Sequence, residues 1–208
     1  MWSETNVNRV AMGRTKSYDR ETLSEKAMNL FRDHGFAGTS AEMLTERLGV
    51  NRYSIYAEFG SKQGLFDAAL DRYDQTVLGP SFGPLEAPGA GIDEIRALFE
   101  FYGSAGTGPA SGRGCLLCNT AIEFGKNDPG GAGFVERYFE RLTGAFFASL
   151  TSARDLGEVG DSIDLGEEAN FLTALVLGLF VLIRAKAPST TIQGAALVAI
   201  NHLDALGR

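Results

Sequence analysis

The chain has 208 residues, of which 44% are hydrophobic and 22% are charged. This composition is typical of a globular protein and excludes an intrinsically disordered one. The longest apolar run covers residues 171–183, fewer than the about 20 residues that a membrane-spanning helix needs, so we expect no membrane partner. The amino terminus lacks the apolar core of a secretory signal, which makes the cytoplasm the expected location.

The net charge of −7 is divided unevenly along the chain. Residues 1–66 carry nine Lys or Arg against eight Asp or Glu, whereas residues 67–208 carry ten against eighteen. Basic side chains are dense between residues 9 and 26 and recur at Arg52 and Lys62. Because DNA repels an acidic surface, this distribution turns the amino-terminal part of the chain towards a nucleic acid.

The first predicted helix covers residues 19–33. Asp19 is the residue expected to cap it, and Gly35 ends it. Its apolar residues recur at the i, i+4, i+7 and i+8 spacing of one helical face; they are Leu23, Ala27, Leu30 and Phe31.

A second helix is predicted to begin at the segment Thr-Ser-Ala-Glu of residues 39–42. This segment has the form of a capping box, in which the side chains of Thr39 and Glu42 each satisfy a free backbone donor. Leu44 and Leu48 then face inward. Gly49, which follows them, favours a tight turn.

A short third helix is predicted over residues 52–59, and a fourth follows Gly60 and Ser61 over residues 62–77. Two helices joined by a short turn that contains glycine form a helix-turn-helix, whose second helix lies in the major groove of DNA. Its first residues meet base edges, so the residues expected to contact DNA are Asn51, Arg52, Tyr53 and Ser54.

These four residues have different chemistry. Arg52 is suited to guanine O6 and N7, and Tyr53 offers a ring to a thymine methyl group and a hydroxyl to a phosphate. We expect Asn51 to cap the helix rather than to pair with adenine. Glu58 carries a negative charge late in the same helix, so we expect it to face sideways or to pair with an arginine. Ile55 and Phe59 are expected in the core.

The remaining segments are also predicted to be helical, and no strand-like alternation competes with them. Residues 78–91 are rich in glycine and proline, which predicts a loop at a domain boundary. A second glycine-rich loop, read as a flexible connector, covers residues 103–114; it lacks the ending of a phosphate-binding loop. The expected helices cover residues 92–102, 134–150, 167–186 and 190–206, and a further helix after residue 114 holds both cysteines. The sequence therefore predicts an all-α protein.

The amino-terminal run resembles the tetracycline-repressor-like (TetR/AcrR) family in its apolar, glycine and hydroxyl positions. The matching residues are Phe31, Gly35, Phe36, Thr39, Gly49, Val50, Ile55, Tyr56, Phe59, Gly60, Ser61, Lys62 and Phe66. The resemblance implies a flexible tail over residues 1–16, a three-helix DNA-binding domain over residues 17–66, and a helical ligand-binding and dimerisation domain over residues 67–208. It also implies phosphate contacts by Thr39, Ser40, Tyr56 and Lys62. Either Met1 or Met12 is the native start.

In function, the resemblance implies a homodimeric regulator and not an enzyme, without a cofactor. We expect a repressor that leaves a palindromic operator in double-stranded DNA when a small-molecule inducer of unknown identity binds; activation stays open. A pocket between helices is expected to use Phe99, Tyr102, Cys118, Asn119, Ile122 and Phe139. The dimer interface is expected at Phe134, Tyr138, Phe146, Phe171, Leu175 and Leu179.

Cys115 and Cys118 form a C-x-x-C motif, which elsewhere signals metal or redox chemistry. A zinc site needs four ligands, and the two histidines of the chain have no recognisable metal spacing, so we expect no metal. No strand precedes the cysteines, as a thioredoxin-type site would require. Two alternatives stay open: a regulator that senses oxidants or electrophiles through these thiols, and a C-x-x-C thiol enzyme. A third is an architectural protein without any ligand.

Overall fold

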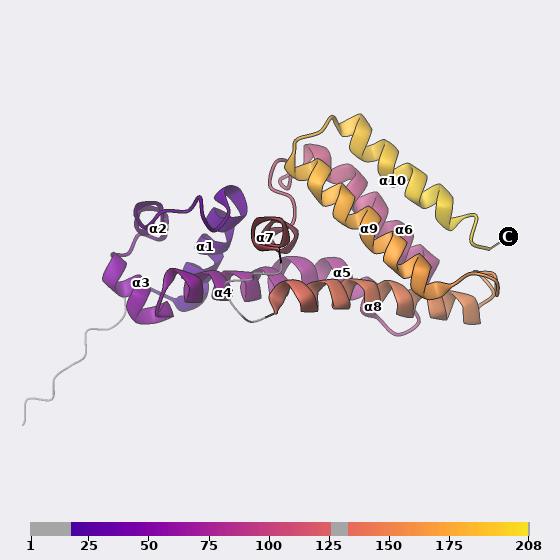
Figure 1. Ribbon diagram of the computed structural model, residues 1–208, viewed down its shortest axis with the longest axis horizontal. Helices are drawn as coiled ribbons and strands as arrows, with labels where there is room; N and C mark the ends of the chain where they lie inside the picture. Colours follow the sequence, from indigo (N-terminus) through magenta and orange to yellow (C-terminus); the bar gives the residue numbers. More distant parts are fainter. Residues whose placement is uncertain (1–17, 126–132, 208) are drawn as a thin grey trace, which may run out of the picture.

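The computed structural model describes residues 18–125 and 133–207. Within these ranges every regular element is a helix and no strand occurs, which confirms the predicted all-α class. Figure 1 shows an elongated molecule with a small helical cluster at one end and a larger helical bundle at the other. The tail predicted over residues 1–16 lies outside the described residues.

The small cluster, called the reader below, contains α1 (Arg20–His34), α2 (Ala41–Leu48) and α3 (Arg52–Phe59). α1 begins as predicted, because an Asp19 carboxylate oxygen accepts a hydrogen bond from the backbone N–H of Thr22 at 2.9 Å. It ends at Gly35, whose φ of 74° favours glycine. The predicted apolar face is buried: Leu23, Ala27, Leu30 and Phe31.

The predicted cap of α2 is wrong by one residue. Ser40, not Thr39, is the N-cap residue, and its hydroxyl accepts the backbone N–H of Met43 at 3.2 Å. The Thr39 hydroxyl is instead buried and donates to the carbonyl of Gly35 at 2.6 Å. Either hydroxyl is chemically able to cap, and the turn after α1 decides between them because it draws Thr39 inward.

The turn and the third helix follow the prediction closely. Gly49 adopts left-handed angles, φ 71° and ψ 23°, between α2 and α3. Asn51 caps α3, since its side-chain oxygen accepts the backbone N–H of Ser54 at 2.8 Å. Leu44, Leu48, Ile55 and Phe59 are buried, as expected.

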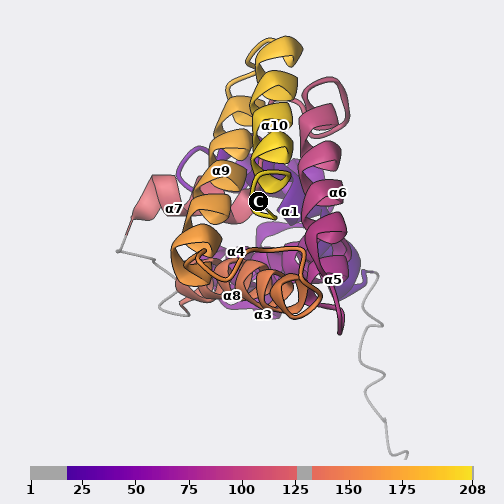
Figure 2. The ribbon, with the colours of Figure 1, turned by 90° about the vertical axis from the view of Figure 1, so that its right-hand side faces the viewer.

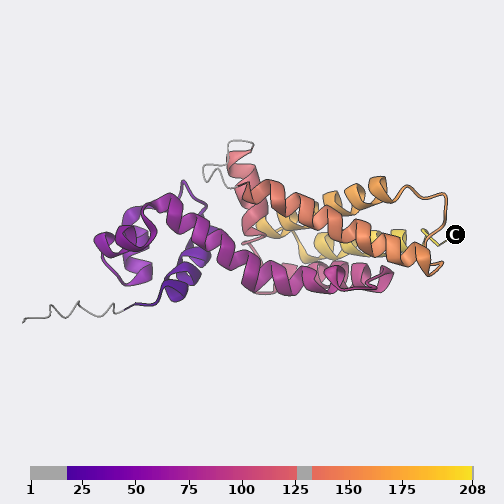
Figure 3. The ribbon, with the colours of Figure 1, turned by 90° about the horizontal axis from the view of Figure 1, so that it is seen from below.

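The loop predicted over residues 78–91 is wrong for most of its length. α4 (Lys62–Tyr73) continues through a π-helical turn, η1 (Asp74–Leu78), into α5 (Gly79–Glu86), and Figure 3 shows these elements as one rod. Pro80 lies in the first turn of α5 and Pro84 lies inside it; the π-helical turn η1 directly precedes them. Burial of Leu78, Phe82 and Leu85 holds the rod in place. Only residues 87–91 form a connection.

The large end of the molecule, called the bundle below, contains α6 (Ile92–Ser104), η2 (Ala105–Thr107), α8 (Phe134–Asp155), α9 (Leu165–Arg184) and α10 (Ser189–Leu203). In Figure 2, α6, α9 and α10 stand side by side above the rod and α8. Phe99 of α6 and Phe146 of α8 stack with their ring centroids 6.4 Å apart in the bundle core.

α7 (Leu116–Phe124) lies between the reader and the bundle and contacts α1, α4, α8 and α9. At its carboxyl end, Phe124 meets Phe36 and Phe66 in an aromatic cluster that joins α7, the α1–α2 turn and α4. Glu123 accepts the backbone N–H groups of Phe36 at 2.9 Å and Ala37 at 2.7 Å. α7 therefore connects the two ends of the molecule directly.

By length and composition alone, α9 is apolar enough to cross a membrane. It is longer than the 13-residue apolar run, because the helix begins at Leu165. Its buried face, which includes Leu172, Val176 and Leu179, packs into the bundle. The core thus explains the apolar residues of its inward face, whereas Phe171 and Val181 on the same helix are exposed.

Candidate nucleic-acid interface and ligand cavity

The outer face of α3 presents the predicted base-reading residues. Arg52 is exposed, and Tyr53 is 82% exposed without enclosure by neighbouring side chains. The Arg52 guanidinium lies over the Tyr56 ring, 5.2 Å from its centroid, and this contact limits the positions of a long side chain. Arg52 and Tyr53 are therefore free to contact base edges.

The side chain of Asn51 and the backbone carbonyl of Ser54 take part in hydrogen bonds within the reader. The side-chain oxygen of Asn51 is used by the cap of α3. The carbonyl of Ser54 accepts the Tyr18 hydroxyl at 3.4 Å. The capping role expected for Asn51 is confirmed.

The four predicted phosphate contacts differ in accessibility. The Thr39 hydroxyl is buried and bonded to Gly35, so its assignment as a phosphate contact is wrong. Ser40 is exposed at the start of α2, and Tyr56 is half-buried. The Lys62 ammonium lies 4.3 Å from the centroid of the Phe36 ring, and burial lowers the pKa of this group while nearby Glu123 opposes the shift.

Glu58 lies as the sequence predicts. Its carboxylate pairs with Arg20 at 3.3 Å, and the same arginine donates to the Glu58 carbonyl at 2.9 Å. Arg20 also lies over the Phe59 ring. α1 thereby holds the negative charge of Glu58 beside the reading face.

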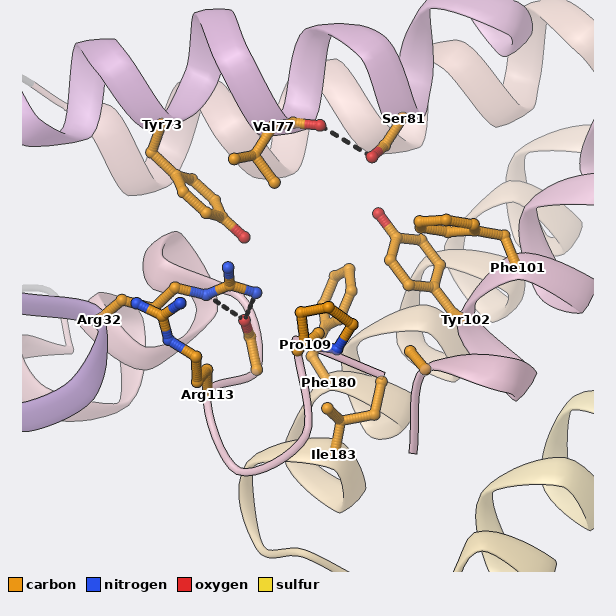
Figure 4. Close-up of a pocket in the computed structure, with 13 residues that line it drawn as sticks. Arg32, Tyr73, Val77, Ser81, Phe101, Tyr102, Pro109, Arg113, Phe180 and Ile183 are labelled. Carbon is orange, nitrogen blue, oxygen red and sulfur yellow. Dashed lines mark hydrogen bonds between the residues drawn. The ribbon is translucent and has the colours of Figure 1, made fainter. Parts of the chain in front are cut away.

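A cavity of about 280 Å³ lies where the reader meets the bundle. Its walls come from α1, the α4–α5 rod, α6, residues 105–114 and α9, and Figure 4 shows the side chains around it. The lining residues are Arg32, Tyr73, Val77, Ser81, Phe101, Tyr102, Ala105, Pro109, Ala110, Arg113, Gly114, Phe180 and Ile183.

Only Tyr102 of the six predicted pocket residues lines this cavity. Phe99 and Cys118 are buried elsewhere in the core, and Asn119 donates to the carbonyl of Arg113 at 2.9 Å. Ile122 is 68% exposed, and Phe139 lies in a separate surface hollow beside Phe147. Cys118 does not line this cavity because α7 turns its cysteine face into the protein core.

The polar groups of the cavity include several that the sequence did not single out. Two guanidinium groups, those of Arg32 and Arg113, meet at one end. The hydroxyls of Tyr73 and Tyr102 point inward from opposite sides. Burial raises the pKa of both phenols, Tyr73 well above its usual value, so both remain protonated near neutral pH.

The residues 103–114 that form one wall are not a free connector. The backbone N–H of Gly112 donates to the carbonyl of Ile183 at 2.9 Å. The Arg113 guanidinium donates to Asp33 at 2.6 Å and to the side chain of Asn29 at 2.8 Å. These bonds fix the segment to α9 and α1, which corrects its interpretation as flexible.

The two cysteines are free and buried. Cys115 is the N-cap residue of α7, and its thiol donates to the Tyr138 hydroxyl at 3.5 Å. Burial raises the pKa of Cys118 to about 12, with the neighbouring Cys115 as a smaller cause. In the part of the chain that the structure describes, no group of three or more His, Cys, Asp or Glu is placed to hold a metal ion. A thiol that is seldom ionised is a poor nucleophile, which disfavours both thiol-based alternatives.

The predicted dimer residues are divided between core and surface. Tyr138 and Phe146 are buried within one protomer, which leaves their side chains no surface for a partner, whereas Leu179, though 3% exposed, lines a surface groove beside Leu175. Phe134 and Leu175 are half-buried, and Phe171 is 44% exposed. The large apolar side chains left exposed on α9 and α10 are Phe171, Val181, Leu197 and Val198.

Comparisons with known proteins agree with this architecture. A model described as "Bacterial regulatory proteins, tetR family" matches residues 23–69, and one described as "Tetracyclin repressor-like, C-terminal domain" matches residues 91–197. The helix-turn-helix-type transcriptional regulator YezE of Bacillus subtilis is 32% identical over 194 residues, 93% of this chain and 100% of YezE. The transcriptional repressor ComR of Escherichia coli is 27% identical over 86% of each chain.

Among solved structures, cysteine-substituted CifR in complex with 26-base-pair operator DNA aligns with a TM-score of 0.80 and 25% identity. The alignment covers 90% of this chain and 98% of that one. The helix-turn-helix reader and these relatives define the protein as a DNA-binding transcriptional regulator, not an enzyme. The chain belongs to the tetR family, as its sequence resemblance predicted.

Proposed function

We propose that this protein is a cytoplasmic repressor that binds a palindromic operator as a homodimer and leaves it when a small molecule enters the cavity. The observation that carries the proposal is that the reader forms one wall of the cavity. Arg32 of α1 donates from two nitrogens to the carbonyl of Gly114, at 2.8 Å and 2.5 Å, on the cavity boundary. A ligand there contacts the reader without an intermediary, and its binding free energy is coupled to that of the operator.

The cavity itself supports a ligand-responsive regulator over an architectural protein without a ligand. Its volume of about 280 Å³ is not filled by side chains, and it combines apolar walls with a few converging polar groups, as ligand sites commonly do. A division of the chain after residue 66 belongs to the same proposal, with the α4–α5 rod transmitting motion between the two domains.

The dimer interface is proposed on α9 and α10. Phe171, Val181, Leu197 and Val198 form the exposed apolar side of these helices. A groove lined by Leu175, Gly178, Leu182 and Ala195 lies between them, and small residues in it permit close approach of a partner helix. An interface of this kind places two readers on one duplex, which matches a palindrome.

The test begins with native mass spectrometry of the purified protein, which reports dimer mass and any retained molecule together. A palindrome selected from random duplexes then serves as the operator in a fluorescence-anisotropy titration. We expect Val198→Arg to give a folded monomer with weak operator binding, and Thr190→Arg, an exposed position at the start of α10, to leave the dimer intact. A wild-type monomer that binds the selected DNA as tightly as a dimer would contradict the proposal.

A further inference from the structure

The end of the cavity nearest the reader is strongly cationic. Arg32, Arg113 and Arg184, called the arginine cluster below, surround the carboxyl end of α1. One carboxylate, that of Asp33, pairs with Arg113 at 2.6 Å. Arg184 is occupied by backbone carbonyls, those of Arg32 at 2.9 Å and of Gly112 and Asp33 at 3.2 Å. Arg113 and Arg184 come from residues 67–208, the part of the chain whose overall charge is negative, and Arg32 comes from the reader.

Arg32 is the member of the cluster with capacity for a ligand. Its Nε and one Nη donate to the Gly114 carbonyl, and the guanidinium lies 5.4 Å from the centroid of the Tyr73 ring. Among the residues that the structure describes, no carboxylate lies within 4.0 Å of this guanidinium. Five N–H donors and a single neutral acceptor leave it able to bind an anion.

The rest of the cavity suits a small apolar body attached to that anion. Val77, Phe180 and Ile183 line its middle, and Tyr102 closes the far side with its hydroxyl inward. Ser81 donates to the carbonyl of Val77 at 2.8 Å, and its hydroxyl also interacts with that of Tyr102. The volume is at the lower end of the roughly 300–1,000 Å³ typical of ligand sites.

We propose that the cavity binds a small organic monocarboxylic acid, with its carboxylate on Arg32 and the Tyr73 hydroxyl and its ring or chain against Val77, Phe180 and Ile183. This inference rests on the proposed function, since it names the class of the inducer. A cation is repelled by the arginine cluster. A neutral apolar molecule leaves the guanidinium without an anionic partner. A multiply charged anion fits the arginine end but not the apolar walls.

The same contact supplies the response of the reader. A carboxylate competes with the Gly114 carbonyl for the N–H groups of Arg32, and a charge-assisted bond is the stronger one. Gly114 precedes α7, whose other end holds the α1–α2 turn through Glu123. When Arg32 leaves Gly114, the segment before α7 loses one of its bonds to α1 and is held there by Arg113, which donates to Asp33 and Asn29. The weakened contact between α1 and α7 is the step that would carry ligand binding to the reader.

The experiment compares each acid with its amide, because the two have nearly the same shape and differ in charge. Benzoate and benzamide, phenylacetate and phenylacetamide, and hexanoate and hexanamide are titrated into the full-length protein by calorimetry. We expect at least one acid to bind about tenfold or more tighter than its amide. Arg32→Gln should remove this preference, whereas Arg96→Gln, which changes an arginine paired with Asp204 away from the cavity, should retain it.

Two results overturn the ligand class: no acid binds better than its amide, or the preference survives in Arg32→Gln. Thermal unfolding of each variant shows whether it is folded; should Arg32→Gln not fold, Tyr73→Phe replaces it and is expected to weaken the acid alone. Operator titrations separate the two proposals. Arg32-dependent binding of an acid that leaves operator affinity unchanged contradicts the inducer function but not the ligand class. Operator release by the amides alone contradicts the ligand class but not the inducer function.

Discussion

The proposed DNA-reading face of α3 and the proposed ligand cavity are built in opposite ways. The reading face consists of successive side chains of one eight-residue helix, and Arg52 and Tyr53 extend from it into solvent. The cavity draws its walls from five helices and a connecting segment, and many of its residues also hold the fold together. Substitutions on the reading face should therefore change function alone, whereas substitutions around the cavity should change function and stability together.

The largest effect is expected where reader, rod and α7 meet, and it tests how far the two regions depend on one another. Phe66 is fully buried, with ring centroids 4.9 Å from Phe31 and 5.0 Å from Phe36. Phe66→Ala should lower the free energy of unfolding by about 3–5 kcal/mol through the cavity it leaves. Chemical denaturation measures this loss. Tyr53→Ala, at an exposed position, should change stability by less than about 0.5 kcal/mol; equal losses in both variants would remove the distinction drawn above.

The buried Cys118 thiol in the interior of the protein should react only slowly with an alkylating reagent. Burial raises the pKa of Cys118 from 9.0 to about 12, which lowers the thiolate fraction at pH 7 about a thousandfold. Alkylation of Cys118 by iodoacetamide should be slower in the native protein than in urea by at least that factor.

The sign of the pH dependence follows from the same shift. Because the folded state favours the neutral thiol, the stability contributed by Cys118 is complete below pH 9 and is lost as the pH rises through about 12. Peptide mapping by mass spectrometry follows this cysteine separately from Cys115. A native rate within tenfold of the unfolded one would revive the thiol-sensing alternative.

A single exposed side chain of the reading face should affect DNA and nothing else. Arg52→Ala removes a bidentate donor to guanine and should weaken operator binding by about 1–3 kcal/mol, which is roughly a 5- to 150-fold rise in Kd. Its unfolding midpoint should stay that of the wild type. Affinity for the selected palindrome is measured beside a variant duplex with one guanine replaced. If Arg52→Ala weakens both duplexes equally, the arginine contacts phosphate and carries no sequence information.

How much of each region is predictable from sequence follows from the same contrast. The bounds of α3 and the cap at Asn51 were predicted because they depend on residues within a few positions of each other. The N-cap residue of α2 was predicted one position too early, because the hydroxyls of Thr39 and Ser40 offer the same chemistry. The turn after Gly35 buries Thr39 and so leaves Ser40 as the cap. The part of the rod up to residue 77 was predicted, but its continuation over residues 78–86 was missed, because the glycines and prolines of that segment, including Pro84 inside α5, are typical of a loop.

The cavity was not predictable in this way, because its members are brought together by folding alone. Arg32 and the Gly114 carbonyl that it binds are 82 positions apart, and nothing near Arg32 in sequence distinguishes it from a surface arginine of the reader. Predicted dimer residues such as Phe146 are buried within one protomer, and the sequence could not show this for a related reason. An apolar helical position such as Phe146 has the same spacing whether it packs inside one protomer or across two.

The smallest expected effect separates the two roles still open to Asn51. Asn51→Ala removes the acceptor for the Ser54 N–H and should destabilise the reader by about 1 kcal/mol, measured by denaturation. Asn51→Ser restores an acceptor at the cap but has no amide to pair with adenine. If capping is the whole role, Asn51→Ser recovers both the stability and the base preferences of the wild type. If Asn51→Ser instead recovers the stability but loses the preference for one A·T pair, Asn51 contacts that base. The reading face would then include the N-cap residue that precedes α3.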